Sequence, residues 1–292
     1  MSGFKGGITR NSFKSVKARK RFFDIISLVI IIFLAVLVMM PLWYVFRSSL
    51  MKSSDIFRWP PVLLPPDWLW SNYNINPLTF DFFKYLGNTL IIVVPCVVFG
   101  TSTAVMCGYA FARLRFRGKK FIFSLCVGSM LLPSMVTLIP LYIGWSTLGL
   151  VGTYYPLIIP YLFGGGAFNI FLLRQFMLSI PRDFDEAAMI DGAGHMRILV
   201  SILVPMIKPA IIVVALLIFI ANWNDLLQQM IYISSKDMYT LTLGLTTFLG
   251  SFKSDYAGMF AATCLTFLPT VIVYLFGQRF FVEGIVMSGI KN

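Results

Sequence analysis

The chain has 292 residues, of which 58% are hydrophobic and 12% are charged, and its mean hydropathy is +0.82. Soluble globular proteins carry about 25% charged residues, so this composition excludes a soluble enzyme or binding module and indicates a polytopic membrane protein. The net charge of +12 comes from 24 basic and 12 acidic residues.

Six apolar stretches are long enough to cross a bilayer, whose hydrocarbon core needs roughly 20 residues per helix. We therefore predict an all-α protein with six transmembrane helices. The first stretch follows a basic arm and has no small-residue cleavage site after it, so it is expected to remain as an uncleaved anchor. The predicted spans cover residues 23–46, 86–112, 121–145, 154–178, 203–231 and 258–282.

These spans divide the chain into four parts. Residues 1–22 form a basic arm, and residues 23–85 comprise the first span and a loop rich in proline and tryptophan. Residues 86–282 form a core with five spans, and residues 283–292 form a short tail. Tryptophan and tyrosine favour the membrane interface, so the loop is expected to lie along the outer surface.

The lysine and arginine residues gather on one side of the predicted topology. With the N-terminus placed inside, the inner segments hold 18 of them and the outer segments hold six. Cytoplasmic loops carry such an excess, so both termini are expected in the cytoplasm. The positive charge then serves topology and contact with the headgroups of the lipid membrane, and no nucleic-acid partner is expected.

Several spans contain residues that interrupt helices. Pro95, Pro133 and Pro140 each remove a backbone donor, and Gly164–Gly166 is a run of glycines. Small residues also let membrane helices approach closely, and kinked helices suit a pathway that opens and closes. The four cysteines fall within predicted spans at spacings that give no metal motif, so no metal site is expected.

The stretch EAAMIDGAGHM, residues 186–196, is polar and rich in small residues although apolar spans lie on both sides of it. Asp183 and Glu186 have the spacing of a helix capping box. Gly192 can end a short helix because glycine accepts the left-handed conformation. We predict two short helices within about residues 183–204, at an angle to each other on the inner membrane face, where they would suit the docking of another protein.

This stretch resembles the EAA motif of ATP-binding-cassette (ABC) importer permeases. Glu186, Ala187, Ala188 and Gly192 match the motif, and its closing I-x-L-P corresponds to Ile202–Pro205, with valine in place of the usual leucine. The stretches YAFARLRFRGKK, LLPSMVTLIPLY, NWNDLL and QRFFVEGI also resemble the sugar-uptake branch of that family, the relatives of the maltose permease. The resemblance covers roughly residues 80–290.

The resemblance implies a type I ABC importer permease in a bacterial plasma or inner membrane, forming half of a pathway for a sugar or oligosaccharide. Its partners would be a second homologous permease, two cytoplasmic ATPases and an external sugar-binding protein. The ATPases would use ATP and Mg, whereas this chain, which has no G-x-x-x-x-G-K-[ST] motif, is expected to bind no cofactor and to have no catalytic residue. By position, the ATPase-coupling residues would be Glu186, Ala187, Ala188, Asp191 and Gly192.

Polar side chains inside membrane spans are costly and often mark a functional pathway. The spacing i, i+3, i+7 places Asn222, Asp225 and Gln229 on one helix face, and the alternative role for such groups is hydrogen bonding between helices. The candidate substrate-pathway residues are Asn88, Thr137, Asn169, Asn222 and Asp225.

Two other classes of function fit a polytopic chain. A secondary, ion-coupled transporter of small polar solutes is the main alternative. Such transporters usually show internal inverted repeats and buried coupling charges, and here Asp225 is the only acidic residue deep in a predicted span. A membrane enzyme would need a catalytic constellation, and the single histidine, His195, has no second histidine with which to form one.

Overall fold

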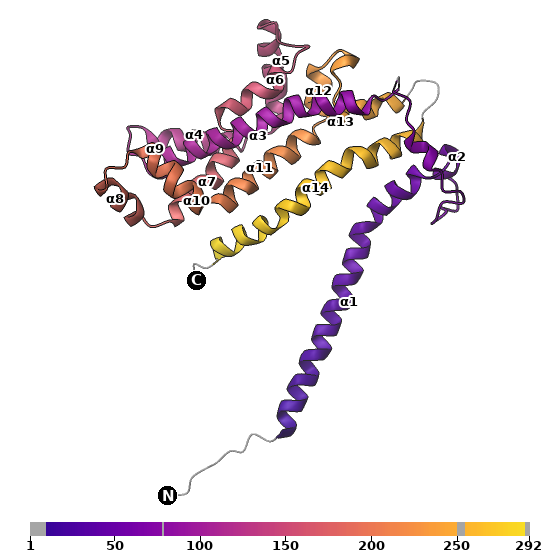
Figure 1. Cartoon of the computed structure of the whole chain (residues 1–292), viewed down its shortest axis with the longest axis horizontal. Coiled ribbons are helices and arrows are strands. Elements are labelled where there is room, and N and C mark those ends of the chain that lie inside the picture. Colours follow the sequence, from indigo (N-terminus) through magenta and orange to yellow (C-terminus); the bar gives the residue numbers. More distant parts are fainter. Residues whose placement is uncertain (1–9, 78, 250–254, 290–292) are drawn as a thin grey trace, which may run out of the picture. The chain divides into compact units, whose positions relative to one another are not determined.

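The structure is a computed structural model of the chain, and it describes residues 10–77, 79–249 and 255–289 (Figure 1). These residues fold into helices and connecting loops without a β-strand, which confirms the predicted all-α class. The chain divides into two compact units. One lies within residues 1–73 and 256–261, and the other lies within residues 74–255 and 262–292.

The helices follow one another along the chain in two halves. The first half contains α1 (Arg10–Ser49), α2 (Ser53–Ile56), η1 (Trp70–Tyr73), α3 (Phe82–Ala112), α4 (Lys119–Ser129), α5 (Ser134–Thr147), α6 (Tyr155–Ile158), η2 (Ile159–Phe163) and α7 (Ala167–Ser179). The second half contains α8 (Asp183–Ile190), α9 (His195–Ile198), the π-helical turn η3 (Leu199–Leu203), α10 (Val204–Met206), α11 (Lys208–Trp223), α12 (Leu227–Tyr232), η4 (Lys236–Met238), α13 (Leu241–Gly244), η5 (Leu245–Phe248) and α14 (Tyr256–Gly289).

Four helical stretches among the described residues are long and apolar enough to cross a membrane: 21–49, 82–112, 155–179 and 256–280. Two further stretches pass the same test as bent pairs. They are α4 with α5, which are bent by 102°, and residues 195–206 with α11, which are bent by 84°. Counted as one span each, the bent pairs bring the number of candidate spans to six, the number predicted. The second pair covers residues 195–223, however, whereas the predicted span was 203–231.

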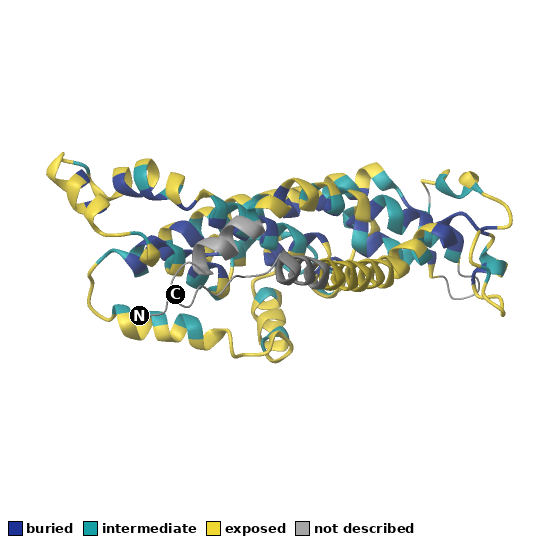
Figure 2. Ribbon diagram, turned by 90° about the horizontal axis from the view of Figure 1, so that it is seen from below, coloured by how far each residue is buried: buried dark blue, intermediate teal, exposed yellow. Residues whose placement is uncertain are grey.

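The smaller unit is dominated by α1. Its apolar side chains are exposed over residues 21–43 (Figure 2). A helix that is apolar on all sides without being covered by protein suits a membrane span facing lipid. Where α1 ends, Met51, Ile56 and Ala257 form a small buried cluster.

The two ends of the chain were predicted to form an arm, residues 1–22, and a tail, residues 283–292. Residues 1–9 of the arm lie outside the described residues, and the rest of the arm belongs to α1. The tail continues α14 as far as Gly289, and its last three residues also lie outside the described part of the chain.

The larger unit is built around α3, which packs along α7 and α11. Ile92, Cys96 and Ala104 on α3 are buried in its core. The helix continues through Pro95, whereas the chain bends at Pro133, which precedes the first residue of α5. Of these two prolines, only Pro133 lies at a bend, where it occupies the N-cap of α5.

The glycine run interrupts the span 155–179, as its sequence predicts. Gly164, Gly165 and Gly166 have positive φ angles of 101°, 61° and 105°, which other residues rarely adopt. A Cβ atom at Gly165 would lie 3.0 Å from the Cα atom of Gly100 on α3, so the two segments touch through their backbones. Thr103 of α3 bonds to the break, because its hydroxyl accepts from the Gly164 N–H at 3.0 Å.

Candidate functional site

The polar segment after α7 folds into short helices joined by a turn, as predicted. Gly192 has a φ angle of +81°, and the N–H of Ala193 donates to the carbonyl oxygen of Ala188 at 2.9 Å. A left-handed glycine with such a bond is a common helix C-terminus. It ends α8 and directs the chain into α9.

The predicted capping box at the start of α8 is not formed. Arg182 occupies the N-cap position, Asp183 is the first helical residue, and no side chain caps this end. Asp183, Asp185 and Glu186 all lie in the first turn. Negative charge in the first turn stabilises a helix through its dipole, so these acids favour α8 without the reciprocal bonds of a capping box.

Asp185 forms a buried ion pair with Arg113, the residue that follows α3. The Arg113 Nε and Asp185 Oδ2 atoms are 2.8 Å apart, and the two side chains are only 4% and 8% exposed. Arg113 Nη2 also donates to the carbonyl oxygen of Ile180 at 3.0 Å. Removal of one partner of a buried pair leaves the other charge unpaired, at a cost of about 3–5 kcal/mol. The pair therefore holds α8 against the end of α3.

Two further contacts join α3 to the same region. The Tyr109 hydroxyl oxygen lies 3.2 Å from Nδ1 of His195, within hydrogen-bond distance. Arg174 Nε on α7 donates to the carbonyl oxygen of Phe111 at 3.1 Å. A cavity of about 570 Å³ lies among these groups, and its wall includes Tyr109, Arg113, Asp185, Glu186, Met189 and His195.

Several apolar side chains of the two short helices are exposed. Ile190 is 87% exposed, Met196 is 61% exposed, and Phe184 and Met189 are each 48% exposed. Exposed apolar side chains with polar neighbours are typical of a protein interaction surface. The exposed acidic residues of α8 supply such polar neighbours.

A second cavity, of about 500 Å³, lies beside the glycine break. Its wall includes Tyr161, Asn169 and the backbone of Gly165 and Gly166. Asn169 is 8% exposed, and its Nδ2 donates to the carbonyl oxygen of Gly165 at 2.6 Å. Non-helical backbone at membrane depth is tolerated where protein buries it or where it lines a water-filled cavity. The non-helical backbone of the glycine break is therefore tolerated where it lines this cavity.

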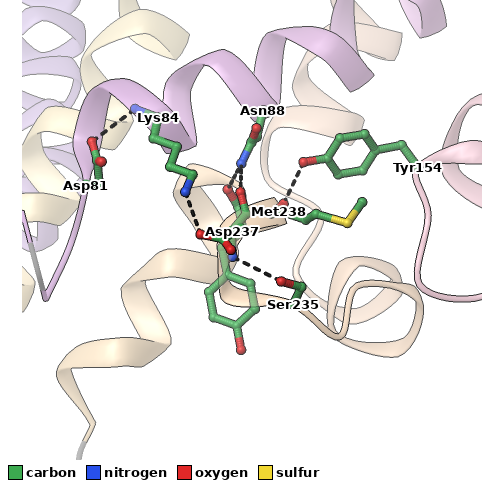
Figure 3. Close-up of polar contacts among 8 residues, drawn as sticks. Asp81, Lys84, Asn88, Tyr154, Ser235, Asp237 and Met238 are labelled. Atoms are coloured by element: carbon green, nitrogen blue, oxygen red, sulfur yellow. Dashed lines mark hydrogen bonds and ion pairs between the residues drawn. The ribbon is translucent and has the colours of Figure 1, made fainter.

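Asn88 lies in a different setting, near the start of α3 (Figure 3). Its Nδ2 donates to the carbonyl oxygens of Asp237 and Tyr239, both at 2.9 Å. One turn earlier, the ammonium group of Lys84 lies 2.6 Å from the Asp237 carboxylate. Through its hydrogen bond and its charge, Lys84 holds the pKa of Asp237 below the usual carboxyl value. These contacts fix the η4 turn to α3.

The profile of the family described as binding-protein-dependent transport system inner membrane component matches residues 100–285. The chain belongs to this family. The diacetylchitobiose uptake system permease protein NgcG of Streptomyces coelicolor is 31% identical over 268 residues, which cover 91% of this chain and 88% of NgcG. The maltodextrin transport system permease protein MdxG of Bacillus subtilis is 33% identical over 214 residues, covering 72% of this chain and 76% of MdxG.

A solved structure of a bacterial ABC transporter involved in the import of the acidic polysaccharide alginate is also similar. The TM-score is 0.77 at 25% identity, and the match covers 96% of this chain and 100% of that one. The predicted fold, that of an ABC importer permease, and the predicted location in the inner membrane are therefore confirmed.

The permease exposes most, but not all, of its predicted coupling residues. Glu186, Ala187, Asp191 and Gly192 are exposed, whereas Ala188 is 8% exposed and belongs to the buried core. Ala188 was predicted as part of the docking surface, but its side chain is buried within the permease. Residues three apart lie on the same side of a helix, so Ala188 faces inward with Asp185.

Of the five predicted pathway residues, Asn169 lines the cavity beside the glycine break. Thr137 and Asn222 each donate to a carbonyl oxygen of their own helix. The Asp225 carboxylate accepts a backbone N–H at the start of α12, and Asn88 is bound to the η4 turn. Like Asn169, these four thus make hydrogen bonds within the permease.

The expectation that Asn222, Asp225 and Gln229 share one helix face is wrong. The helix is interrupted over residues 224–226, between α11 and α12, so helical spacing does not carry across. Gln229 is buried instead among backbone and side-chain partners. Its Nε2 donates to the carbonyl oxygen of Asn222 at 3.3 Å, and its Oε1 accepts from the hydroxyl of Thr240.

The sequence did not point to the contacts of Arg113 and Tyr109. The available signals were a cation directly after an apolar span and an acid directly before Glu186. A single sequence does not show which cation meets which acid, because the partners are 72 residues apart. The exposed apolar residues of α8 could not be recognised from the sequence either, because 58% of the residues of the chain are hydrophobic.

Proposed function

We propose that the permease forms half of the translocation pathway of an ABC importer for a sugar or oligosaccharide, together with a second homologous permease. An external sugar-binding protein delivers the substrate. Two cytoplasmic ATPases, which use ATP and Mg, supply the energy. The family description supports dependence on a binding protein, and the names of the relatives NgcG and MdxG support a saccharide as substrate.

The observation that carries this proposal is the exposed surface of α8. It presents Glu186, Ala187 and Asp191 beside the exposed Ile190, while Asp185 anchors the same helix from beneath. A small surface that offers acidic and apolar contacts on a firmly held helix suits a partner that must transmit force. The permease brings no nucleotide motif of its own, so we assign this surface to the ATPases.

The proposal places α8 and both chain termini in the cytoplasm, in accord with the distribution of the basic residues. This topology has a direct test. Single cysteines introduced at Arg117 and at Asp67 should differ in their reaction with a membrane-impermeant maleimide on intact cells. Asp67 should react, and Arg117 should react only after permeabilisation.

Within the spans, we assign Asn169 to the substrate pathway. Sugars need amide and hydroxyl partners for their hydroxyl groups, and the cavity beside the glycine break offers Asn169 and Tyr161 in its wall. Since Asn169 Nδ2 is bonded to Gly165, its Oδ1 atom is the group assigned to the substrate.

The function is tested by isolating the complex through an affinity tag on this chain. Two copies of an ATPase and a second permease should co-purify. Reconstituted vesicles supplied with the binding protein should take up labelled maltodextrin or diacetylchitobiose when ATP is present and no ion gradient exists. Uptake that requires an ion gradient and ignores ATP would establish the ion-coupled alternative instead.

A further inference from the structure

We propose that Arg113 and Asp185 are positioning residues that make α8 and α3 move as one body, so that α3 passes displacement of α8 to the glycine break beside the membrane cavity. The inference rests on the proposed function, because that function supplies the force on α8. It assigns the attachment of α8 to α3 to one buried ion pair and not to the exposed residues of α8.

The first step is the attachment of α8 to α3. The side chains of Arg113 and Asp185 are 4% and 8% exposed, so neither is available to a partner protein. Arg113 also binds the carbonyl oxygen of Ile180, which lies where the chain leaves α7 for α8. One guanidinium group thus holds both α8 itself and the segment that leads into it.

The second step is the stiffness of α3. Between Thr103 and Ala112 the helix is continuous, without proline or a break. At 1.5 Å per residue, the distance from Thr103 to Arg113 along the axis is about 15 Å. Tyr109 and Phe111, on the same stretch, make the additional contacts with α9 and α7 described above. A movement imposed at Arg113 is therefore carried along this stretch with little loss.

The third step is the contact of α3 with the glycine break. The hydroxyl of Thr103 accepts from the Gly164 N–H at 3.0 Å. A Cβ atom at Gly165 would lie 3.0 Å from the Gly100 Cα and 3.2 Å from the Gly100 carbonyl oxygen. Gly165 also lines the 500 Å³ cavity. A shift of α3 is thus delivered to a backbone segment that is free of side chains and borders the cavity.

The attachment is tested by distance measurement on the purified chain. The four native cysteines are replaced, and spin labels are placed at cysteines introduced at Arg115 and Asp183, both exposed. The parent protein should give one narrow distance distribution. R113Q and D185N should each broaden it, and R113Q/D185N should broaden it no further than either single variant. R117Q, which changes an exposed arginine of the same segment, should leave it narrow.

Variants that lose one charge of a buried pair can fail to fold. R113M/D185L removes both charges and leaves neither unpaired, so it keeps the experiment decisive. A broadened distribution in this variant supports the positioning role. If R113Q, D185N or R113M/D185L folds and keeps the parent width, the pair does not position α8 and the proposal is overturned.

The consequence for transport is measured in the tagged complex. R113Q and D185N should retain the co-purifying ATPases and their hydrolysis of ATP, but the number of labelled maltodextrin molecules transported per ATP should fall well below that of the parent. An unchanged ratio would contradict the inference. If the parent chain binds no ATPase and transports no sugar, the proposed function fails, while the distance measurement still decides whether Arg113 and Asp185 position α8.

Discussion

The Lys84 ammonium and the Asp237 carboxylate lie 2.6 Å apart, although 153 residues separate them in the chain. Asn88, one turn further along α3, donates to two carbonyl oxygens of the same turn, η4. An ion pair and two hydrogen bonds thus fix one short loop to the start of α3. The polar character of this end of the helix is explained by that attachment.

Asn88 and Asn169 should therefore respond differently to replacement by alanine. N88A removes two hydrogen bonds at a partly exposed site, so it should lower the free energy of unfolding by about 1 kcal/mol for each bond and leave the apparent affinity for sugar unchanged. N169A should weaken that affinity. Thermal unfolding and the concentration dependence of uptake check the two parts. Equal effects of both variants on affinity would contradict this assignment.

The Lys84–Asp237 pair should make a small, pH-dependent contribution to stability. The pKa of Asp237 in the folded protein is below its usual value because Lys84 stabilises the carboxylate. The contribution is therefore complete at neutral pH and is lost as the pH falls through this lowered pKa. We expect D237N to unfold at a slightly lower temperature than the parent at neutral pH, with the difference vanishing in strong acid.

High salt should also reduce the difference between D237N and the parent, because both groups are exposed and screened by ions. K84Q should match D237N, and K84Q/D237N should be no less stable than either single variant. If the loss of stability in the double variant equalled the sum of the losses in the two single variants, the two residues would act separately.

Gly165 should be intolerant of even a methyl group. Its φ angle is +61°, and the added Cβ atom would meet backbone atoms of Gly100, which cannot rotate away. We expect G165A to cost about 1–3 kcal/mol of stability, the usual range for overpacking. G144A is the matched control, because Gly144 lies in a helix with nothing within 4 Å of its Cβ position. Thermal unfolding of both purified variants checks the contrast.

Ile190, which lies beside the polar residues of the motif, should make a large contribution to ATPase binding. I190D puts a charge on a side chain that is 87% exposed, so the permease itself should remain stable. A buried apolar contact with the ATPase would be lost, and co-purification of the ATPase should fall strongly. E186K should have a similar effect through its reversed charge. Full retention of the ATPase by both variants would place the docking surface elsewhere.

The sequence predicted those parts of the fold that depend on local properties. Hydropathy located the spans, and the run Gly164–Gly166 located the break, because each follows from residues that are adjacent in the chain. The contacts of Arg113 with Asp185 and of Lys84 with Asp237 could not be predicted, since they depend on how distant helices pack. The supposed common face of Asn222 and Asp225 failed because helical spacing was extended across an interruption that the apolar pattern does not reveal.

The hydrogen bond between Thr103 and Gly164 has a consequence for the order in which the permease is assembled. In lipid, the broken segment 155–179 would expose unpaired backbone groups at a cost of several kcal/mol each. Thr103 belongs to a helix that precedes the glycine run in the chain and is therefore synthesised before it. The first helix of the larger unit thus offers a hydrogen-bond partner to a backbone segment that is synthesised after it.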